Sequence, residues 1–310
     1  MWDLLWPIKW VIELILVGFH SLFTGMGLAP SDGVTWVLAI TGLVIVVRAA
    51  LIPIFVKQIK SQRNMLVVQP ELQKLQKKYK GKTDPDSRQA FAKEQMDLYK
   101  KYDANPLSSC LPLLLQMPIF TGLFFVLNEA QHNKQGVGLL TKDLAQSFSN
   151  ATVFGAPLKD TFLTSEQVSV KIVAALMIIL MTASQFITQK QILAKNQNPA
   201  VMTSQYMQTQ KIMLYIFPVI FAISGISFPL GVMTYWLVSN FWTMGQQFVV
   251  IRNMPTPGSQ AHAAREARLA KRGKLPKSVA KVEETPAVEA PVKTQRSQPV
   301  SKNRAKKSAK

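Results

Sequence analysis

The stretch of sequence that decides the fold runs from Ile212 to Ile251 and reads IMLYIFPVIFAISGISFPLGVMTYWLVSNFWTMGQQFVVI. It contains no Lys, Arg, Asp or Glu. As a single helix it would be about 60 Å long, twice the roughly 30 Å thickness of the hydrocarbon core of a bilayer. A proline disfavours helical backbone in the residue before it, so we expect the helix to break at Ser227-Phe228-Pro229. The sequence therefore predicts two membrane spans, 212–228 and 230–251, joined by a tight turn.

Three other segments are long and apolar enough to cross a bilayer: residues 34–56, 106–127 and 172–188. The chain carries 36 Lys and Arg against 17 Asp and Glu, yet its mean hydropathy is positive, +0.13. Apolar and basic residues must therefore occupy different segments, as they do in a membrane protein with basic loops. We predict an all-α polytopic membrane protein with a five-span core over residues 34–251.

The N-terminal apolar segment, residues 1–28, follows a different pattern. Its polar residues are spaced so that they share one helical face. They are Lys9, Glu13, His20 and Thr24. Trp2, Trp6 and Trp10 add the aromatic residues typical of a membrane interface. The pattern predicts an amphipathic helix lying in the membrane surface, with a sixth span as the alternative. Because no basic residue precedes the apolar stretch, we do not expect a cleavable signal peptide.

Residues 57–105 have the pattern of a charged helical hairpin. Apolar residues recur at helical spacing on both arms: Val68, Leu72, Leu75 and Tyr79 on the first, and Phe91, Leu98 and Tyr102 on the second. Asp84 and Pro85 are suited to the N-cap and the first helical residue of the second arm. Pro70 should break or kink the first arm. We predict a short antiparallel coiled coil in water, with a solvated loop as the alternative.

Residues 252–310 hold fifteen basic and four acidic residues and few large apolar ones. Such a composition cannot bury enough apolar surface to fold, which predicts a disordered basic tail. Its charge suits phosphate-bearing partners, either anionic lipid headgroups or RNA. A tail that only keeps the protein soluble is the alternative.

Basic residues are distributed unequally among the connections between spans. Residues 57–103 hold twelve Lys and Arg, and residues 190–211 hold three without an acidic residue. Residues 131–167 hold three that are balanced by three acidic residues. The positive-inside rule places the hairpin and the tail in the cytoplasm and the N-terminus outside.

Arg48 is the most informative residue, because it is the one charge within the 34–56 span. An arginine at the centre of a spanning helix costs about 2.5 to 3.5 kcal/mol, so we expect Arg48 to face a water-filled cavity. The alternative is an anchor at the interface. Five polar residues of other spans either line this cavity or form interhelical hydrogen bonds. They are Gln116, Ser184, Gln185, Ser239 and Asn240.

Enzyme chemistry is not expected from this sequence. His20, His132 and His262 lie in separate regions, and no Walker-type loop or metal-ligand spacing is present. We therefore expect no catalytic residues, no metal and no cofactor.

Three motifs carry a resemblance to the YidC family of membrane-protein insertases. They are Asn105-Pro106-Leu107-Ser108-Ser109-Cys110-Leu111-Pro112, then Gln116-Met117-Pro118-Ile119-Phe120, and Tyr235-Trp236-Leu237-Val238-Ser239-Asn240 followed by Gln246-Gln247. An arginine in the first span before a basic hairpin completes the pattern, and the match runs in order from Trp6 to Ile251.

The resemblance implies five helices around a hydrophilic groove that opens to cytoplasm and lipid and is closed outside. It implies that Arg48 attracts acidic or polar parts of a substrate, with Gln185 and Trp236 as groove residues of the third and fifth spans. It further implies nascent membrane proteins as substrates in the plasma membrane, chaperone activity, a ribosome recruited by the hairpin and tail, and action alone or beside a Sec-type translocase. Val44 stands where some members carry a hydroxyl, and the chain resembles the smaller members without a large extracytoplasmic domain.

Two other classes of function are compatible with a basic membrane protein. A solute transporter or channel predicts internal repeats, paired half-helices and more charge within the membrane, whereas this sequence has one deep charge and no repeat. A structural tether for RNA or ribosomes predicts that the tail matters and Arg48 does not.

Overall fold

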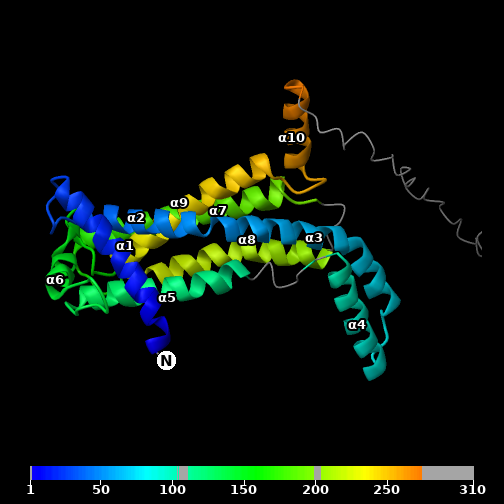
Figure 1. The fold of residues 1–310 in the computed structure, drawn as a ribbon, viewed down its shortest axis with the longest axis horizontal. Coiled ribbons are helices and arrows are strands. Elements are labelled where there is room, and N and C mark those ends of the chain that lie inside the picture. Colours follow the sequence, from blue (N-terminus) through cyan, green and yellow to red (C-terminus); the bar gives the residue numbers. More distant parts are fainter. Residues whose placement is uncertain (1, 103, 105–110, 199–203, 274–310) are drawn as a thin grey trace, which may run out of the picture. The chain divides into compact units, whose positions relative to one another are not determined.

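The computed structural model describes residues 2–102, 104, 111–198 and 204–273. The elements are a 3-10 turn η1 (Trp2–Leu5), α1 (Trp6–Gly25), α2 (Gly33–Ala50), α3 (Ile52–Lys78), α4 (Pro85–Lys101), α5 (Leu111–Gln131), α6 (Lys142–Asn150), β1 (Thr152–Val153), β2 (Ala156–Pro157), α7 (Val168–Lys195), α8 (Ser204–Gly225), α9 (Leu230–Asn253) and α10 (Gln260–Lys271). Residues 1–265 form one compact unit and residues 266–310 another. Within the described residues, the regular secondary structure is helical except for one short antiparallel strand pair (Figure 1).

The charge-free stretch forms two helices, and the break lies where the sequence predicted it. α8 ends at Gly225 and α9 begins at Leu230, with Pro229 in the N-cap position. Backbone hydrogen bonds hold this turn against residues 158–163: Gly231 N donates to Leu158 O over 2.8 Å, and Leu163 N donates to Ile226 O over 3.2 Å. The turn is therefore tied to a segment more than sixty residues away along the sequence.

The predicted span 34–56 is not one helix. α2 ends at Ala50, and α3 begins at Ile52 with Pro53 in its first turn. The cause is local, because a proline lacks the N–H that would continue the helix and restricts the residue before it. α3 then runs to Lys78 through Pro70, so of the break or kink expected at Pro70, the break does not occur. The other predicted spans overlap α5 and α7, while residues 105–110 lie outside the described residues.

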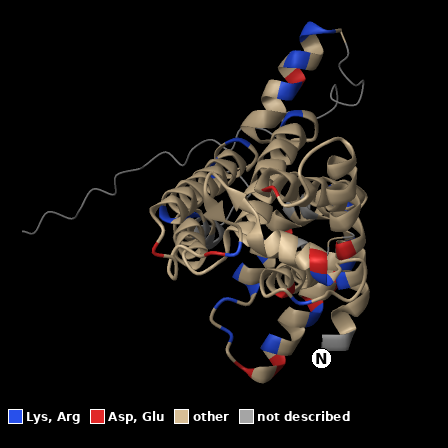
Figure 2. Ribbon diagram, turned by 90° about the vertical axis from the view of Figure 1, so that its left-hand side faces the viewer, with Lys and Arg blue, Asp and Glu red and all other residues tan. Residues whose placement is uncertain are grey.

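By length and composition, α1, α2 and α7 are long and apolar enough to cross a membrane. Figure 2 shows that much of the helical ribbon carries no charged residue. Large apolar side chains are exposed along α7 and α8, among them Ile172, Ile179, Tyr215, Val219 and Ile223. Such a surface suits contact with lipid, and the count of five spans remains a prediction.

The hairpin predicted for residues 57–105 is present as the distal part of α3 and α4 (Figure 1). Val68 and Leu72 are buried between the arms. The Tyr79 ring meets Phe91 edge-on with centroids 5.7 Å apart. Asp84 caps α4 by accepting a hydrogen bond of 2.8 Å from Ser87 N, as predicted. A solvated loop is therefore excluded.

Residues 132–167, here called the cap segment, form a folded unit, although their sequence pattern indicated only a loop between spans. α6 and the β1–β2 pair belong to it, and Phe148 and Leu158 are fully buried. The Phe148 ring lies edge-on to Trp36 of α2 with centroids 5.3 Å apart, and Trp36 Nε1 donates to Ser147 Oγ over 3.2 Å. The cap segment therefore closes one end of the helical core.

The sequence predicted disorder throughout residues 252–310. For residues 252–273, which the structure describes, this prediction is wrong. α9 continues to Asn253, and α10 occupies Gln260–Lys271. Thr256 is buried, and its N–H donates to Asn196 Oδ1 over 2.8 Å. Local signals explain the helix, since α10 is rich in the helix formers Ala and Arg and Ser259 Oγ accepts a hydrogen bond from His262 N. Residues 274–310 lie outside the described residues.

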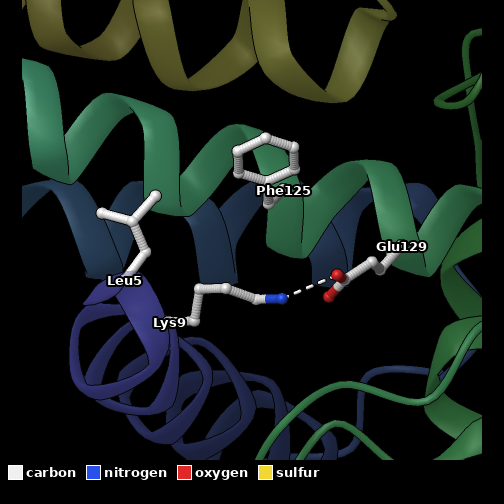
Figure 3. A pocket seen from close by; sticks show the side chains of 4 residues that line it. All are labelled: Leu5, Lys9, Phe125 and Glu129. Carbon is white, nitrogen blue, oxygen red and sulfur yellow. Dashed lines mark hydrogen bonds and ion pairs between the residues drawn. The ribbon is translucent and has the colours of Figure 1, made fainter. Parts of the chain in front are cut away.

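The polar stripe of α1 faces the protein, whereas a helix lying in the membrane surface would turn its polar face to water. Lys9 Nζ lies 2.6 Å from Glu129 Oε1 of α5 in a small pocket completed by Leu5 and Phe125 (Figure 3). Glu13 is fully buried, and His20 Nε2 donates to Pro30 O over 2.9 Å. The exposed face is apolar and includes Trp6, Trp10, Val11 and Leu14. The position of α1 in the membrane stays a prediction.

Candidate functional site

Three helices bring polar side chains together at Tyr235. Gln116 Nε2 of α5 donates a hydrogen bond of 2.8 Å to the Tyr235 hydroxyl of α9. Tyr235 is 3% exposed. A buried tyrosine hydroxyl normally finds a hydrogen-bond partner, and here the partner comes from a helix more than a hundred residues away.

Arg48 lies in the last turn of α2 and is half-buried. Arg48 lies near the Tyr235 side chain of α9. The ion pairs in the described part of the chain do not include Arg48. Because α2 ends at Ala50, Arg48 is close to the end of its helix, where the helix dipole favours a cation. Arg48, Gln116 and Tyr235, here called the polar site, thus combine a cation without a described counter-ion and two neutral hydrogen-bonding groups.

Aromatic rings bound the polar site on the side of the cap segment. The Phe120 ring, one helical turn beyond Gln116, lies 5.6 Å from Trp236 and 6.4 Å from Phe228 between centroids. Phe221 of α8 meets Trp236 edge-on at 4.8 Å. These four residues, here called the aromatic plug, join α5, α8, α9 and the α8–α9 turn. Trp236 therefore packs against Phe120, one helical turn from Gln116, and its role as a groove residue stays a prediction.

Asn240 lies at the contact of α7 with α9. Asn240 Nδ2 donates to Met181 O of α7 over 3.5 Å, which is the interhelical role that the sequence also allowed. Gln185 is half-buried on α7, and no described contact joins it to Arg48. Their roles as groove residues stay predictions.

Tyr235 is the residue that sequence reasoning missed. It stands next to Trp236 in one of the family motifs, and a tyrosine in an apolar helix is by itself an ordinary feature. The available signal was its hydroxyl within a charge-free stretch, a group that needs a partner. The position of that partner could not be inferred from the sequence.

Comparison with known proteins identifies the family. The sequence model of the family described as 60Kd inner membrane protein matches residues 28–257. A protein named Membrane protein insertase YidC from Streptomyces avermitilis is 47% identical over 274 residues, covering 86% of this chain and 61% of that relative. Proteins of the same name from Tropheryma whipplei (strain Twist) and Bifidobacterium longum are 43% and 37% identical, and each comparison covers 96% of the relative.

The chain thus spans less than two thirds of the Streptomyces relative and nearly the whole of the other two. The family match includes α2, which carries Arg48, and α9, which carries Tyr235. The family match at residues 28–257 covers most of the range from Trp6 to Ile251 over which the sequence shows the resemblance. This chain belongs to the YidC family, the family described as 60Kd inner membrane protein.

Proposed function

We propose that this chain is a membrane-protein insertase and chaperone of the plasma membrane that works without enzyme chemistry. The relatives named above are insertases by name. The observation that carries the proposal is the convergence of Arg48, Gln116 and Tyr235 from three apolar helices. A buried polar group is costly in a membrane, so such a cluster marks a place where polar groups of another molecule are accommodated.

The polar site can lower the barrier for a substrate in a simple way. A nascent membrane protein must carry a polar tail through apolar surroundings, and each unsatisfied polar group there costs several kcal/mol, on the order of 2–7. The Arg48 guanidinium offers five donors to an acidic or polar tail. Gln116 and Tyr235 offer neutral partners beside it. The polar site thereby shortens the apolar thickness to be crossed, and burial of the substrate's own apolar helix drives the remainder.

The aromatic plug gives this groove a closed end. Phe120, Phe228 and Trp236 fill the space between the polar site and the cap segment with rings. In this proposal the groove opens toward the hairpin. With the loop charges, this supports an N-terminus outside and a cytoplasmic C-terminus and hairpin.

The basic hairpin and tail are suited to recruiting the ribosome and anionic lipids, because both partners present phosphates. Gln185 and Asn240 extend the proposed groove along α7 and α9. The insertase acts alone or beside a Sec-type translocase. The alternative of a solute transporter or channel gains no support from the relatives, since those named above are insertases.

The charge of Arg48 provides the test. Insertion of a single-span substrate with an acidic tail into proteoliposomes is measured for Arg48→Lys, Arg48→Ala and Arg48→Glu. Arg48→Lys should retain most of the activity, while the other two should lose most of it for this substrate. Accumulation should change little, because Arg48 has no ion pair in the described structure. Wild-type insertion by Arg48→Ala would refute the proposal for this class of substrate.

A further inference from the structure

The two helices that carry Arg48 and Gln116 hardly touch each other. α2 and α5 share few close contacts, whereas α1 packs extensively on both. α1 therefore lies across the gap between them (Figure 1). The spacing of the polar site is thus not set by direct packing of α2 on α5 but by the helices that pack on both, which are α1 and, with a smaller contact on α5, α9.

Two glycines let α1 approach these helices closely. A Cβ at Gly42 of α2 would lie 2.6 Å from the Phe19 ring of α1. A Cβ at Gly122 of α5 would lie 3.0 Å from Ile8 and 3.1 Å from Ile12. Side chains larger than hydrogen would push α1 away at either place.

Both contact points lie at the same distance from the polar site. Gly42 precedes Arg48 by six residues, and Gly122 follows Gln116 by six residues. At the rise of an α-helix, each is about 9 Å along its helix from the site residue, on the side of the cap segment. α1 thus meets α2 and α5 at one level, just beyond the polar site.

A buried carboxylate fastens α1 in this place. Glu13 accepts hydrogen bonds from Val137 N, Gly138 N and Leu140 N over 2.9, 2.7 and 3.3 Å. The loop is shaped around it, because a Cβ at Gly136 would lie 2.3 Å from Glu13 Oε1. Hydrogen bonds from backbone N–H groups to a carboxylate are strong. Here they satisfy the Glu13 oxygens without water. The Lys9–Glu129 ion pair adds a second polar tie to α5.

We propose that α1 is a brace that sets the spacing of α2 and α5 at the polar site, and that Glu13 is the positioning residue that locks it. Its effect on insertion rests on the function proposed above. α1 is thereby a part of the insertase core, and its buried polar face serves packing instead of contact with water.

The test measures the distance between α2 and α5 in the full chain. Spin labels are attached at Val46→Cys and Leu114→Cys, both exposed positions, in a Cys110→Ser background in proteoliposomes. Gly42→Leu should shift or broaden the distance by about 2 Å, the range over which side chains alter helix separation. Gly18→Leu is the matched control, because Gly18 lies on the exposed side of α1 with nothing within 4 Å of its Cβ position.

A compensating substitution distinguishes a specific change of helix spacing from nonspecific misfolding. Phe19→Ala combined with Gly42→Leu exchanges side-chain volume across the contact and should restore the wild-type distance. Glu13→Gln, nearly unchanged in size, should broaden the distance even if Gly42→Leu fails to accumulate. Wild-type distances in both Glu13→Gln and Gly42→Leu, or an equal shift in Gly18→Leu, would overturn the brace.

Insertion is measured on the same samples, together with Arg48→Ala. A severalfold loss in Glu13→Gln that follows the distance change supports the brace and the groove together. A changed distance with undiminished insertion would uphold the brace and count against the groove. Loss of insertion in Arg48→Ala together with an unchanged distance in Glu13→Gln would uphold the groove and count against the brace.

Discussion

Gln116 and Tyr235 are joined by a hydrogen bond of 2.8 Å that links α5 to α9 beside Arg48. The two residues are separated by 119 positions in the sequence. The hydroxyl is held in an almost fully buried residue, so its loss leaves an amide without this partner. This pair makes the polar site sensitive to substitutions that remove very few atoms.

Tyr235→Phe should lower the thermal stability of the detergent-solubilised protein, because the Gln116 amide loses its partner. Leaving a fully buried donor unsatisfied costs about 1–3 kcal/mol, and because Gln116 is half-buried the loss should lie near the lower end of this range. The double variant Gln116→Leu with Tyr235→Phe should be less destabilised than the sum of the two single variants. Tyr215→Phe is the control, since Tyr215 is exposed on α8. If the double variant is destabilised by the full sum of the two single variants, the hydrogen bond contributes no stability of its own.

Labelling of single cysteines tests the orientation. An impermeant maleimide applied to intact cells should modify Asn150→Cys of the cap segment and spare Thr83→Cys of the hairpin turn. Both positions are exposed in the structure, so accessibility alone does not decide the result. The expectation follows from the basic charge of the hairpin. Modification of Thr83→Cys without modification of Asn150→Cys would invert the topology.

The hairpin should loosen in acid because of Glu94. Hydrogen bonds from Lys78 and Tyr79 hold the pKa of the Glu94 carboxyl below its ordinary value. A group with a lowered folded pKa contributes stability above its unfolded pKa, about 4.3, and loses it as pH falls through the folded value. The mobility of a spin label at Thr83→Cys should therefore rise at low pH, and Glu94→Gln should show the higher mobility already at pH 7.

The matched control for this prediction is Asp97→Asn on the exposed side of α4. It should leave the mobility at neutral pH as in wild type. Equal mobility in Glu94→Gln and wild type at neutral pH would show that the contact with Lys78 and Tyr79 does not hold the arms together.

Truncation after Gly273 should weaken ribosome co-sedimentation at low salt. It removes ten basic and three acidic residues and keeps α10. Binding through exposed charge falls steeply as salt rises, so the difference from wild type should shrink at high salt. Truncation after Met254 removes α10 as well and shows what that helix contributes. Binding that is unchanged by both truncations would exclude this segment from ribosome recruitment.

Local chemistry made several elements predictable from the sequence alone. The break before Leu230 follows from Pro229, and the start of α4 follows from the Asp84 cap, because each depends on residues within one helical turn. The seam of the hairpin follows from the spacing of Val68 and Leu72. The spacing of Lys9 and Glu13 likewise defines one polar face of α1, since four residues make about one helical turn.

Tertiary structure alone decided which way that face points and what the polar site contains. A face is defined by residues a few positions apart, but Glu13 finds its donors at residues 137–140 and Gln116 finds Tyr235 on another helix. Periodicity indicates that one face of a helix differs in its surroundings from the rest. It does not indicate whether hydrogen-bond donors, a counter-ion or water will compensate a charge on that face. Whether such a partner exists depends on contacts across more than a hundred residues, and those arise only when the helices pack.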